Sequence, residues 1–290
     1  MKPLDNRAWL FMLPAVAVLL FVGIVPLVTV FNYSFFDIFS LQQLNWVGVQ
    51  WYRDILSTER FYDALARSVV FSAIVLCVQI PLGVGIALIL PRSGWRQSVA
   101  LMLLAAPLVV PSNMIPIMWL NLISPAGLAG RTFAWLGIAF DYKFNAIHTW
   151  LVLVVMDTWH WLGLVVVLAY SGLSSIQPAF YQAAAIDGAS RFQIFRHIEL
   201  PKIGGVLSMA LLLRFVDSFM IYTEAFRINA GGPNGATTFL SLDLGEDIQG
   251  FNYGMAAARS MIYFLMILIV AWSFKTTMDG RKKLQTVKRA

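Results

Sequence analysis

The sequence predicts an all-α membrane protein with six transmembrane helices, on the strength of its composition, its charge and its long apolar runs. Hydrophobic residues make up 59% of the 290 residues, charged residues only 12%, and the mean hydropathy is +0.72, outside the range of a soluble domain. Several apolar runs have the about 20 residues that a helix needs to cross a bilayer. We expect a single membrane domain over residues 1–290.

The first three expected spans carry no formal charge. The first is longer than the apolar region of a signal peptide, which is usually about 7–15 residues, so we expect it to be retained. Prolines at 26, 81, 107, 111 and 116 predict kinks, which serve as ordinary bends or as hinges. The single cysteine, Cys77, excludes an intramolecular disulfide. The six spans are Trp9–Val30, Ser68–Leu90, Ser98–Ile123, Trp150–Leu173, Gly204–Phe226 and Gly254–Phe274.

Lys and Arg are distributed unevenly between the two sides of the expected bundle. Arg53, Arg60, Arg131 and Lys143 flank one side. Because positive residues favour the cytoplasmic side of a membrane protein, both termini and the loop 178–201 are predicted to be cytoplasmic. The other side has thirteen: Lys2, Arg7, Arg92, Arg96, Arg191, Arg196, Lys202, Lys275, Arg281, Lys282, Lys283, Lys288 and Arg289.

The connections between spans contain further short elements. Residues 32–62 form an expected outer loop in which Trp46–Tyr52 predicts an interfacial turn and a short helix. The loop 124–148 predicts a surface helix around Thr132–Ile138. A third outer loop, 229–253, opens with the turn-forming cluster Gly231–Gly235.

The loop 178–201 predicts two short helices joined by a sharp turn. Pro178 suits a first helical turn, and Ala179–Ile186 is rich in alanine. Gly188 accepts the left-handed conformation that ends a helix, and Ser190 is placed to cap a second helix through Gln193. The second helix would expose Phe192, Phe195 and His197 and end before Pro201. Such an apolar surface indicates a binding partner.

This loop resembles the coupling loop of ABC-importer permeases, on which the ATPase subunit pushes. The family pattern is Glu-Ala-Ala, three residues, Gly-Ala, and an aromatic-rich helix that ends in Leu-Pro. Gln182 stands where most members carry Glu, which removes the charge for an ion pair with the ATPase. The resemblance implies that the ATPase contacts Gln182, Ala183, Ala184, Asp187, Gly188, Ala189, Phe192, Phe195 and Pro201.

The resemblance extends over essentially the whole chain. Gly231–Pro233 with Ala236–Leu240, and the stretch Leu212–Glu224, look like permeases for sugars, glycerol phosphate and polyols, with glycerol permeases the most similar. The resemblance implies a type I ABC-importer permease fold in the bacterial cytoplasmic membrane. It also implies a second homologous permease, two cytoplasmic ATPase subunits and an external solute-binding protein, with glycerol as the expected substrate.

Ionisable side chains inside the last three spans mark an expected substrate pathway. Each costs at least about 2.5–3.5 kcal/mol on insertion scales and so needs a cavity or a partner. Arg214 and Asp217 share a helical face, which allows either a structural ion pair or a substrate contact. His160 is interpreted as an interhelical hydrogen-bonding residue, and Gln79, Asn113 and Asn121 as links between helices. The pathway is expected to include Asp157, Trp159, Trp161, Asp217, Tyr222 and Glu224.

The chain lacks the sequence patterns of several other classes. It has no phosphate-binding Gly-x-x-x-x-Gly-Lys-Ser/Thr loop, so ATP and Mg²⁺ are expected on a partner ATPase, with no cofactor or metal in this chain. A permease subunit that is not itself an enzyme is therefore predicted, with membrane lipid rather than nucleic acid around it. An ion-coupled transporter using Asp157, Asp217 and Glu224 is the alternative, and an intramembrane enzyme with His160 as base is a third.

Overall fold

The computed structural model describes residues 8–40 and 43–287, and the side chains of residues 11–38 and 43–277. Of the thirteen Lys and Arg residues on the predicted cytoplasmic side, four lie outside the described residues: Lys2, Arg7, Lys288 and Arg289. The chain divides into two compact units, which are described separately. The smaller contains residues up to Tyr62 with Asp243–Val270, and the larger contains Asp63–Leu242 and the residues from Ala271 onward.

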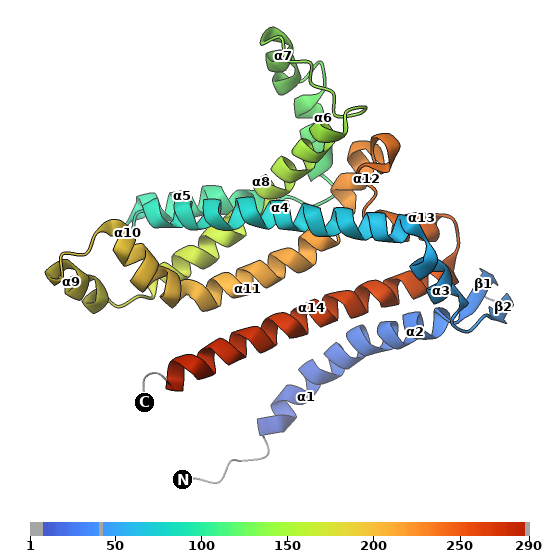
Figure 1. Cartoon of the computed structure of the whole chain (residues 1–290), viewed down its shortest axis with the longest axis horizontal. Helices are drawn as coiled ribbons and strands as arrows, with labels where there is room; N and C mark the ends of the chain where they lie inside the picture. The colour runs from blue at the N-terminus through green and yellow to red at the C-terminus, as the bar shows by residue number, and fades with distance from the viewer. Residues whose placement is uncertain (1–7, 41–42, 288–290) are drawn as a thin grey trace. The chain divides into compact units, whose positions relative to one another are not determined.

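The larger unit contains helices and no strand among its described residues (Figure 1). Its elements are α4 (Glu59–Ile89, whose first turn belongs to the smaller unit), α5 (Trp95–Ala105), the 3₁₀ turn η2 (Ala106–Val109), α6 (Ile115–Ile123), α7 (Leu128–Trp135), α8 (Ala146–Ser174), α9 (Pro178–Ile186), α10 (Arg191–Ile194), the π turn η3 (Phe195–Glu199), α11 (Leu200–Phe219), α12 (Thr223–Asn229) and the 3₁₀ turn η4 (Pro233–Gly235).

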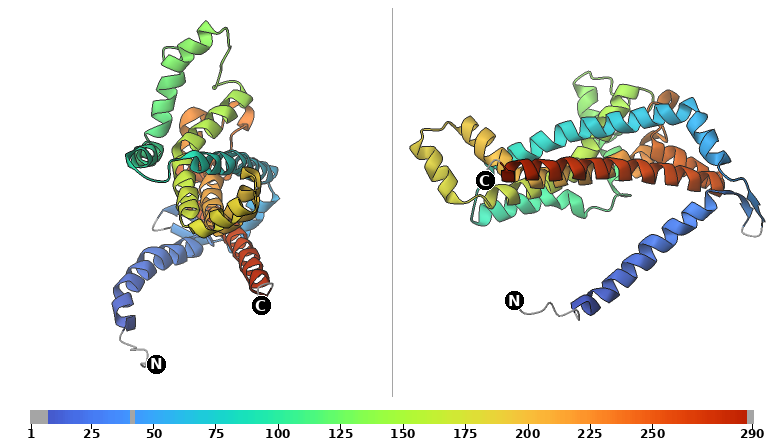
Figure 2. Two further views of the ribbon diagram at one scale, coloured as in Figure 1. Left: turned by 90° about the vertical axis from the view of Figure 1, so that its left-hand side faces the viewer. Right: turned by 60° about the horizontal axis from the view of Figure 1, so that its bottom comes forward.

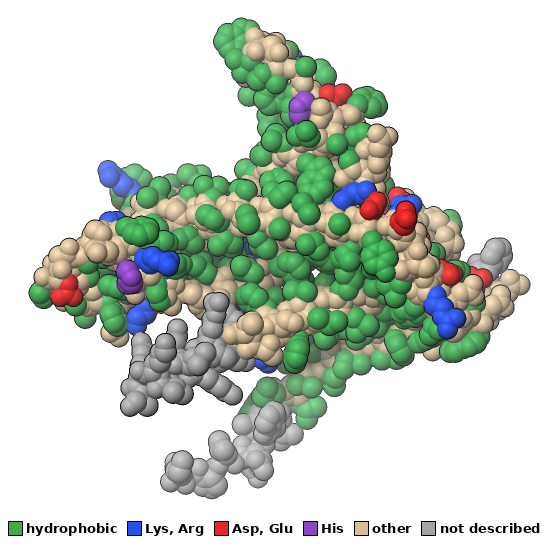
Figure 3. Space-filling model, viewed as in Figure 1, with side chains coloured by type: hydrophobic (Ala, Val, Ile, Leu, Met, Phe, Trp, Pro, Cys, Tyr) green, Lys and Arg blue, Asp and Glu red, His purple; other side chains and the backbone are tan. Residues whose placement is uncertain are grey.

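Five helical stretches among the described residues are long and apolar enough to cross a membrane. A shorter apolar stretch, Trp95–Val109, accompanies them, which agrees with the predicted all-α membrane class. Hydrophobic side chains predominate along α4 on the face seen in Figure 3. The five stretches are Phe11–Tyr33, Glu59–Ile89, Ala146–Ser174, Arg191–Asn229 and Tyr253–Thr277.

The predicted third span, Ser98–Ile123, is not one continuous helix, in keeping with the kinks predicted at its prolines. It divides into α5 with η2 and, after a break, α6. The break falls at Pro111, which has no N–H to donate and forces the residue before it out of the helical region. Val110 is accordingly extended, with φ −71° and ψ 125°. Pro81, by contrast, lies inside α4 without interrupting it.

The predicted fifth span, Gly204–Phe226, is also interrupted. Helix α11 ends at Phe219, and α12 begins four residues later, at Thr223. The interruption frees backbone carbonyls that a membrane helix would otherwise satisfy internally. The hydroxyl of Ser241 donates to one of them, the carbonyl of Ile221. The chain therefore turns here without leaving this carbonyl unpaired.

Helix α8 packs against α5, α6, α11 and α12 in the larger unit. Gly163 permits the closest of these approaches, because a Cβ there would lie 2.0 Å from the carbonyl oxygen of Leu104. Small residues at helix contacts allow such proximity in membrane bundles. The buried apolar cores on either side of this contact include Phe71, Leu153 and Met156 in one cluster and Val166 and Ile203 in the other.

The smaller unit contains the elements at both ends of the described chain. Its short antiparallel hairpin pairs Phe36 with Trp46, and the sequence did not predict it. The indole of Trp51 donates to the Phe36 carbonyl at 3.0 Å. Its elements are α1 (Ala8–Leu19), the π turn η1 (Leu20–Ile24), α2 (Val25–Tyr33), β1 (Phe36–Ser40), β2 (Gln43–Trp46), α3 (Gln50–Ser57), most of α13 (Leu240–Gln249) and much of α14 (Tyr253–Val287).

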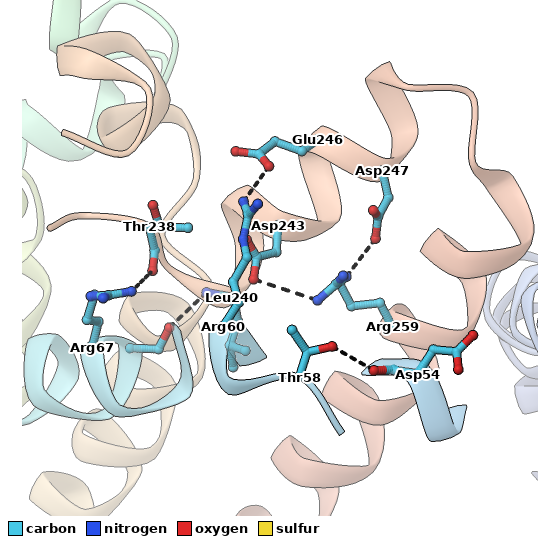
Figure 4. A network of polar contacts seen from close by, with 11 residues as sticks. Asp54, Thr58, Arg60, Arg67, Thr238, Leu240, Asp243, Glu246, Asp247 and Arg259 are labelled. Atoms are coloured by element: carbon cyan, nitrogen blue, oxygen red, sulfur yellow. Dashed lines mark hydrogen bonds and ion pairs between the residues drawn. The ribbon is translucent and has the colours of Figure 1, made fainter. Parts of the chain in front are cut away.

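An ion-pair network joins the first turn of α4 to α13 and α14 in the smaller unit (Figure 4). Arg60 donates to Asp243 at 2.8 Å and also pairs with Glu246, while Arg259 donates to Asp247 at 2.6 Å. Asp243 is only 2% exposed. Burial raises the pKa of this carboxyl, and the two arginines oppose that shift. The network thus compensates a buried charge.

Candidate functional site

A cavity of about 150 Å³ lies in the larger unit where α11 gives way to α12. The break after Phe219 places the ends of these two helices, together with the middle of α8, around one space. The lining is mostly polar or aromatic, and three of its side chains are carboxylates. The lining residues are Ser112, Asp157, His160, Trp161, Asp217, Met220, Ile221, Tyr222, Thr223 and Glu224.

Arg214 is not among the residues that line the cavity, but its side chain contacts three that are: Asp157, Asp217 and Trp161. Its guanidinium donates to Asp157 at 2.5 Å and to Gln79 at 2.8 Å, and it forms an ion pair with Asp217. The guanidinium carbon also lies 4.7 Å from the centre of the Trp161 ring, a cation–π distance. Arg214 is fully buried and Asp157 is 5% exposed. Each buried charge therefore has a partner, as a membrane interior requires.

Asp217 is more exposed than Asp157, the other carboxylate that pairs with Arg214. The side chain of Asp217 is 45% exposed, although it pairs with Arg214. Asp157 also accepts a hydrogen bond from Gln79 at 2.7 Å, so Asp157, Gln79 and Arg214 form a closed triangle. The triangle fixes Asp157, whereas Asp217 keeps oxygen surface free to meet a solute.

Five of the six predicted pathway residues line this one cavity. They are Asp157, Trp161, Asp217, Tyr222 and Glu224. The sixth, Trp159, is not among the lining residues. Its ring contacts Trp119 edge-on, with centroids 6.0 Å apart, and packs against the apolar core.

Of two further polar residues of the cluster, one lies as expected and one does not. Gln79 links helices as predicted, because its side chain on α4 donates to Asp157 on α8 and accepts from Arg214 on α11. His160 was expected to be a satisfied hydrogen-bonding residue, but its Nδ1 has no hydrogen-bond partner among the described residues. His160 lines the cavity, but its Nδ1 is buried. For both Gln79 and His160, the only indication in the sequence was a polar residue within an apolar run.

The loop 178–201 has the predicted form of two short helices and a turn. Helix α9 begins at Pro178 and ends at Ile186, and Gly188 follows with φ +69°. A side chain other than glycine is strained in that conformation. Ser190 and Gln193 form the predicted capping box at the start of α10. Figures 1 and 2 show this loop protruding at one end of the larger unit.

The outer surface of the loop is only partly as expected. Ile186 is 87% exposed and Phe192 70% exposed, whereas Phe195 is half-buried and packs against the core. An open groove of about 300 Å³ lies between α9 and the second helix. Its lining residues are Phe180, Ala183, Ala184, Asp187, Ala189, Gln193, Ile194, His197 and Ile198.

The second helix of the loop does not end before Pro201, so that prediction was wrong. The chain widens into the π turn η3 and continues directly as α11. The Leu200 N–H bonds five residues back, to the Phe195 carbonyl. A π turn accommodates the missing donor of Pro201, and η1 precedes Pro26 in the same way. The loop is consequently continuous with the helix that carries Arg214.

Comparison with known proteins identifies both the family and the fold. Residues 79–280 match the binding-protein-dependent transport system inner membrane component family. The trehalose/maltose transport permease MalF of Thermococcus litoralis is 29% identical over 263 residues, covering 90% of this chain and 89% of the relative. The diacetylchitobiose uptake permease DasB of Streptomyces coelicolor is 26% identical over 271 residues, covering 90% of this chain and 83% of the relative.

A solved structure has the same fold. A chain of a bacterial ABC transporter for the acidic polysaccharide alginate superposes with a TM-score of 0.78 at 20% identity. The match covers 94% of this chain and 96% of that one. The names of the two sequence relatives refer to sugars, so these comparisons do not support the narrower prediction of glycerol.

Proposed function

The chain belongs to the binding-protein-dependent transport system inner membrane component family, and from its cavity we propose that it passes a neutral sugar or polyol. It is a multi-pass inner-membrane permease of an ABC sugar importer and not an enzyme. The single observation that carries the substrate proposal is the charge around the cavity. The three carboxylates Asp157, Asp217 and Glu224 face one guanidinium, that of Arg214.

This charge distribution favours uncharged substrates over anions. The acidic groups outnumber the guanidinium, and in a low-dielectric wall this excess disfavours a phosphate or a sugar acid. Carboxylates that keep free lone pairs accept hydrogen bonds from hydroxyl groups, and the indole of Trp161 offers a flat face to the C–H side of a sugar ring. Oligosaccharides such as maltose fit this chemistry, and so does the smaller polyol glycerol.

The substrate class is tested by competition in proteoliposomes that contain the assembled transporter. Uptake of a labelled sugar should be inhibited by neutral sugars or polyols, and not by glycerol phosphate or sugar acids. Asp217→Asn should raise KM for the neutral sugar, because one acceptor for hydroxyls becomes a weaker one. Asp54→Asn, at an exposed position outside the cavity, is the matched control. Preferential inhibition by the anions would refute the proposal.

The loop 178–201 is proposed to bind a cytoplasmic ATPase subunit. Support comes from the exposed apolar side chains of Ile186 and Phe192 beside an open groove. A transporter of this kind needs two ATPases, which bind ATP with Mg²⁺, a second homologous permease and an external solute-binding protein. Both termini lie on the cytoplasmic side in this arrangement, in keeping with the Lys and Arg bias.

Copurification tests this docking surface. Phe192→Ala removes an exposed aromatic ring and should weaken recovery of the ATPase with tagged permease. Trp135→Ala removes a comparably exposed ring from α7 and serves as the control. Unchanged ATPase recovery with Phe192→Ala would contradict the proposed docking.

A further inference from the structure

A buried carboxylate, Glu199, lies where the loop 178–201 joins α11. Its side chain is fully buried at the last position of the π turn η3. Arg191 donates to Oε2 at 2.6 Å, and the Tyr181 hydroxyl donates to Oε1 at 3.1 Å. Arg92 lies 3.8 Å from Oε1. None of these residues belongs to the predicted coupling surface or to the substrate pathway.

The three partners of Glu199 come from three different segments. Tyr181 is on α9, Arg191 begins α10, and Arg92 belongs to the connection between α4 and α5. The Arg92 guanidinium also lies 4.6 Å from the centre of the Tyr181 ring. That connection is anchored to α8, because the Tyr170 hydroxyl donates to the Pro91 carbonyl at 2.9 Å.

The protonation of Tyr181 suits this arrangement. Burial raises the pKa of its phenol, so the hydroxyl stays protonated and can donate to the carboxylate. The two arginines keep contact with water, since their side chains are 65% exposed at Arg92 and 56% at Arg191. The buried Glu199 carboxylate therefore has donor groups from α9, α10 and the α4–α5 connection around it.

Stability alone does not account for a carboxylate at this position. A buried ion pair costs desolvation free energy, and apolar residues of similar size often replace such pairs without loss. An apolar side chain would fill the space without orienting the three segments. A carboxylate with donors from Tyr181, Arg191 and Arg92 holds all three at fixed angles, which is the use of buried polar groups with the best support.

Glu199 also lies at one end of the helix that reaches the cavity. Helix α11 runs without interruption from Leu200 to Phe219. Arg214 is fifteen residues beyond Glu199, or about 22 Å at the rise of an α-helix. A displacement of the loop would reach Arg214 and Asp217 through this helix only if the loop and the helix move together.

We propose that Glu199 is a positioning residue that clamps the loop 178–201, α11 and the α4–α5 connection into one rigid body, which carries ATPase movement to the cavity. The proposal rests on the proposed docking of that loop on an ATPase. Loss of the clamp would leave the ATPase bound while the loop moves without α11.

Spin-label distances test the clamp directly. The labels are placed at Ala179→Cys on the loop and Ser98→Cys on α5, both exposed, with Cys77→Ser as background. The assembled transporter should give one narrow distance distribution, identical without nucleotide and after trapping with ATP and vanadate. Glu199→Gln should broaden it. The proposal would be overturned if the distance between the labels changes on trapping while Glu199 is intact. It would also be overturned if the distance distribution stays narrow in Glu199→Gln.

The ratio of substrate transported to ATP hydrolysed separates positioning from folding. Arg92→Gln changes only an exposed partner, so the protein should fold even where Glu199→Gln does not. We expect this ratio to fall about tenfold, within the range for residues that link two sites. Arg96→Gln, an exposed arginine at the start of α5, should leave it unchanged.

These results are distinguishable from a failure of the docking proposal. Docking is judged by whether Phe192→Ala loses the ATPase, whereas the clamp is judged by label distances and by the transport ratio. If Arg92→Gln lowers ATPase recovery and not the transport ratio, Glu199 only shapes the docking surface, and the clamp is wrong.

Discussion

Replacing Arg214 by Met tests the buried charge cluster most severely. Met keeps an unbranched side chain but is shorter and removes every donor, so Asp157, 5% exposed, retains only Gln79 among its hydrogen-bond partners. Removing one partner of a buried ion pair costs about 3–5 kcal/mol. Asp217 adds little to this cost, because its side chain is 45% exposed and water replaces the guanidinium.

The free energy of unfolding is measured by titration with SDS in mixed micelles. Arg214→Met should lose about 3–5 kcal/mol, and adding Asp157→Leu should recover most of it because no unpaired charge remains. Arg227→Met is the control: this arginine is exposed on α12, and surface changes usually stay within about 0.5 kcal/mol. A loss below about 1 kcal/mol for Arg214→Met, or no recovery in the double variant, would refute the buried pair.

Three further outcomes follow from the cavity and the loop. Gly188→Leu forces a side chain into the left-handed region at φ +69°, costing about 1–2 kcal/mol locally, so substrate-stimulated ATP hydrolysis and transport should fall together while membrane insertion persists. Trp161→Ala should raise KM for the sugar more than Trp159→Ala, since only Trp161 lines the cavity; equal effects on KM would contradict this assignment. Gln182→Glu should preserve copurification of the ATPase, and its loss would show that no cation faces this exposed position.

The sequence sufficed for the features that depend on local composition. Apolar length predicted the spanning helices, and the capping pair Ser190 and Gln193 predicted the start of α10. The turn at Gly188 followed from the conformational freedom of glycine. Each of these signals lies within a few neighbouring residues, so no tertiary contact was needed to interpret it.

Features that depend on tertiary contacts escaped prediction. Proline predicted kinks at both Pro81 and Pro111, but only Pro111 breaks its helix, and nothing local to the sequence separates the two. Trp159 and Trp161 are two positions apart in one helix and therefore point in different directions, and only the packing of α8 decides which one reaches the cavity. Glu199 was indistinguishable from a surface acid until its three distant donors were located.

The role of this chain as an ATP-driven importer subunit for neutral sugars is tested most directly by reconstitution. The chain is assembled with its partner permease and ATPases in proteoliposomes, the binding protein is added outside, and uptake of a labelled neutral sugar is measured. Uptake should require both ATP inside and the binding protein, stop with vanadate, and persist when the proton gradient is collapsed. Uptake by this chain alone, driven by a proton gradient and insensitive to vanadate, would contradict the account and favour a secondary transporter.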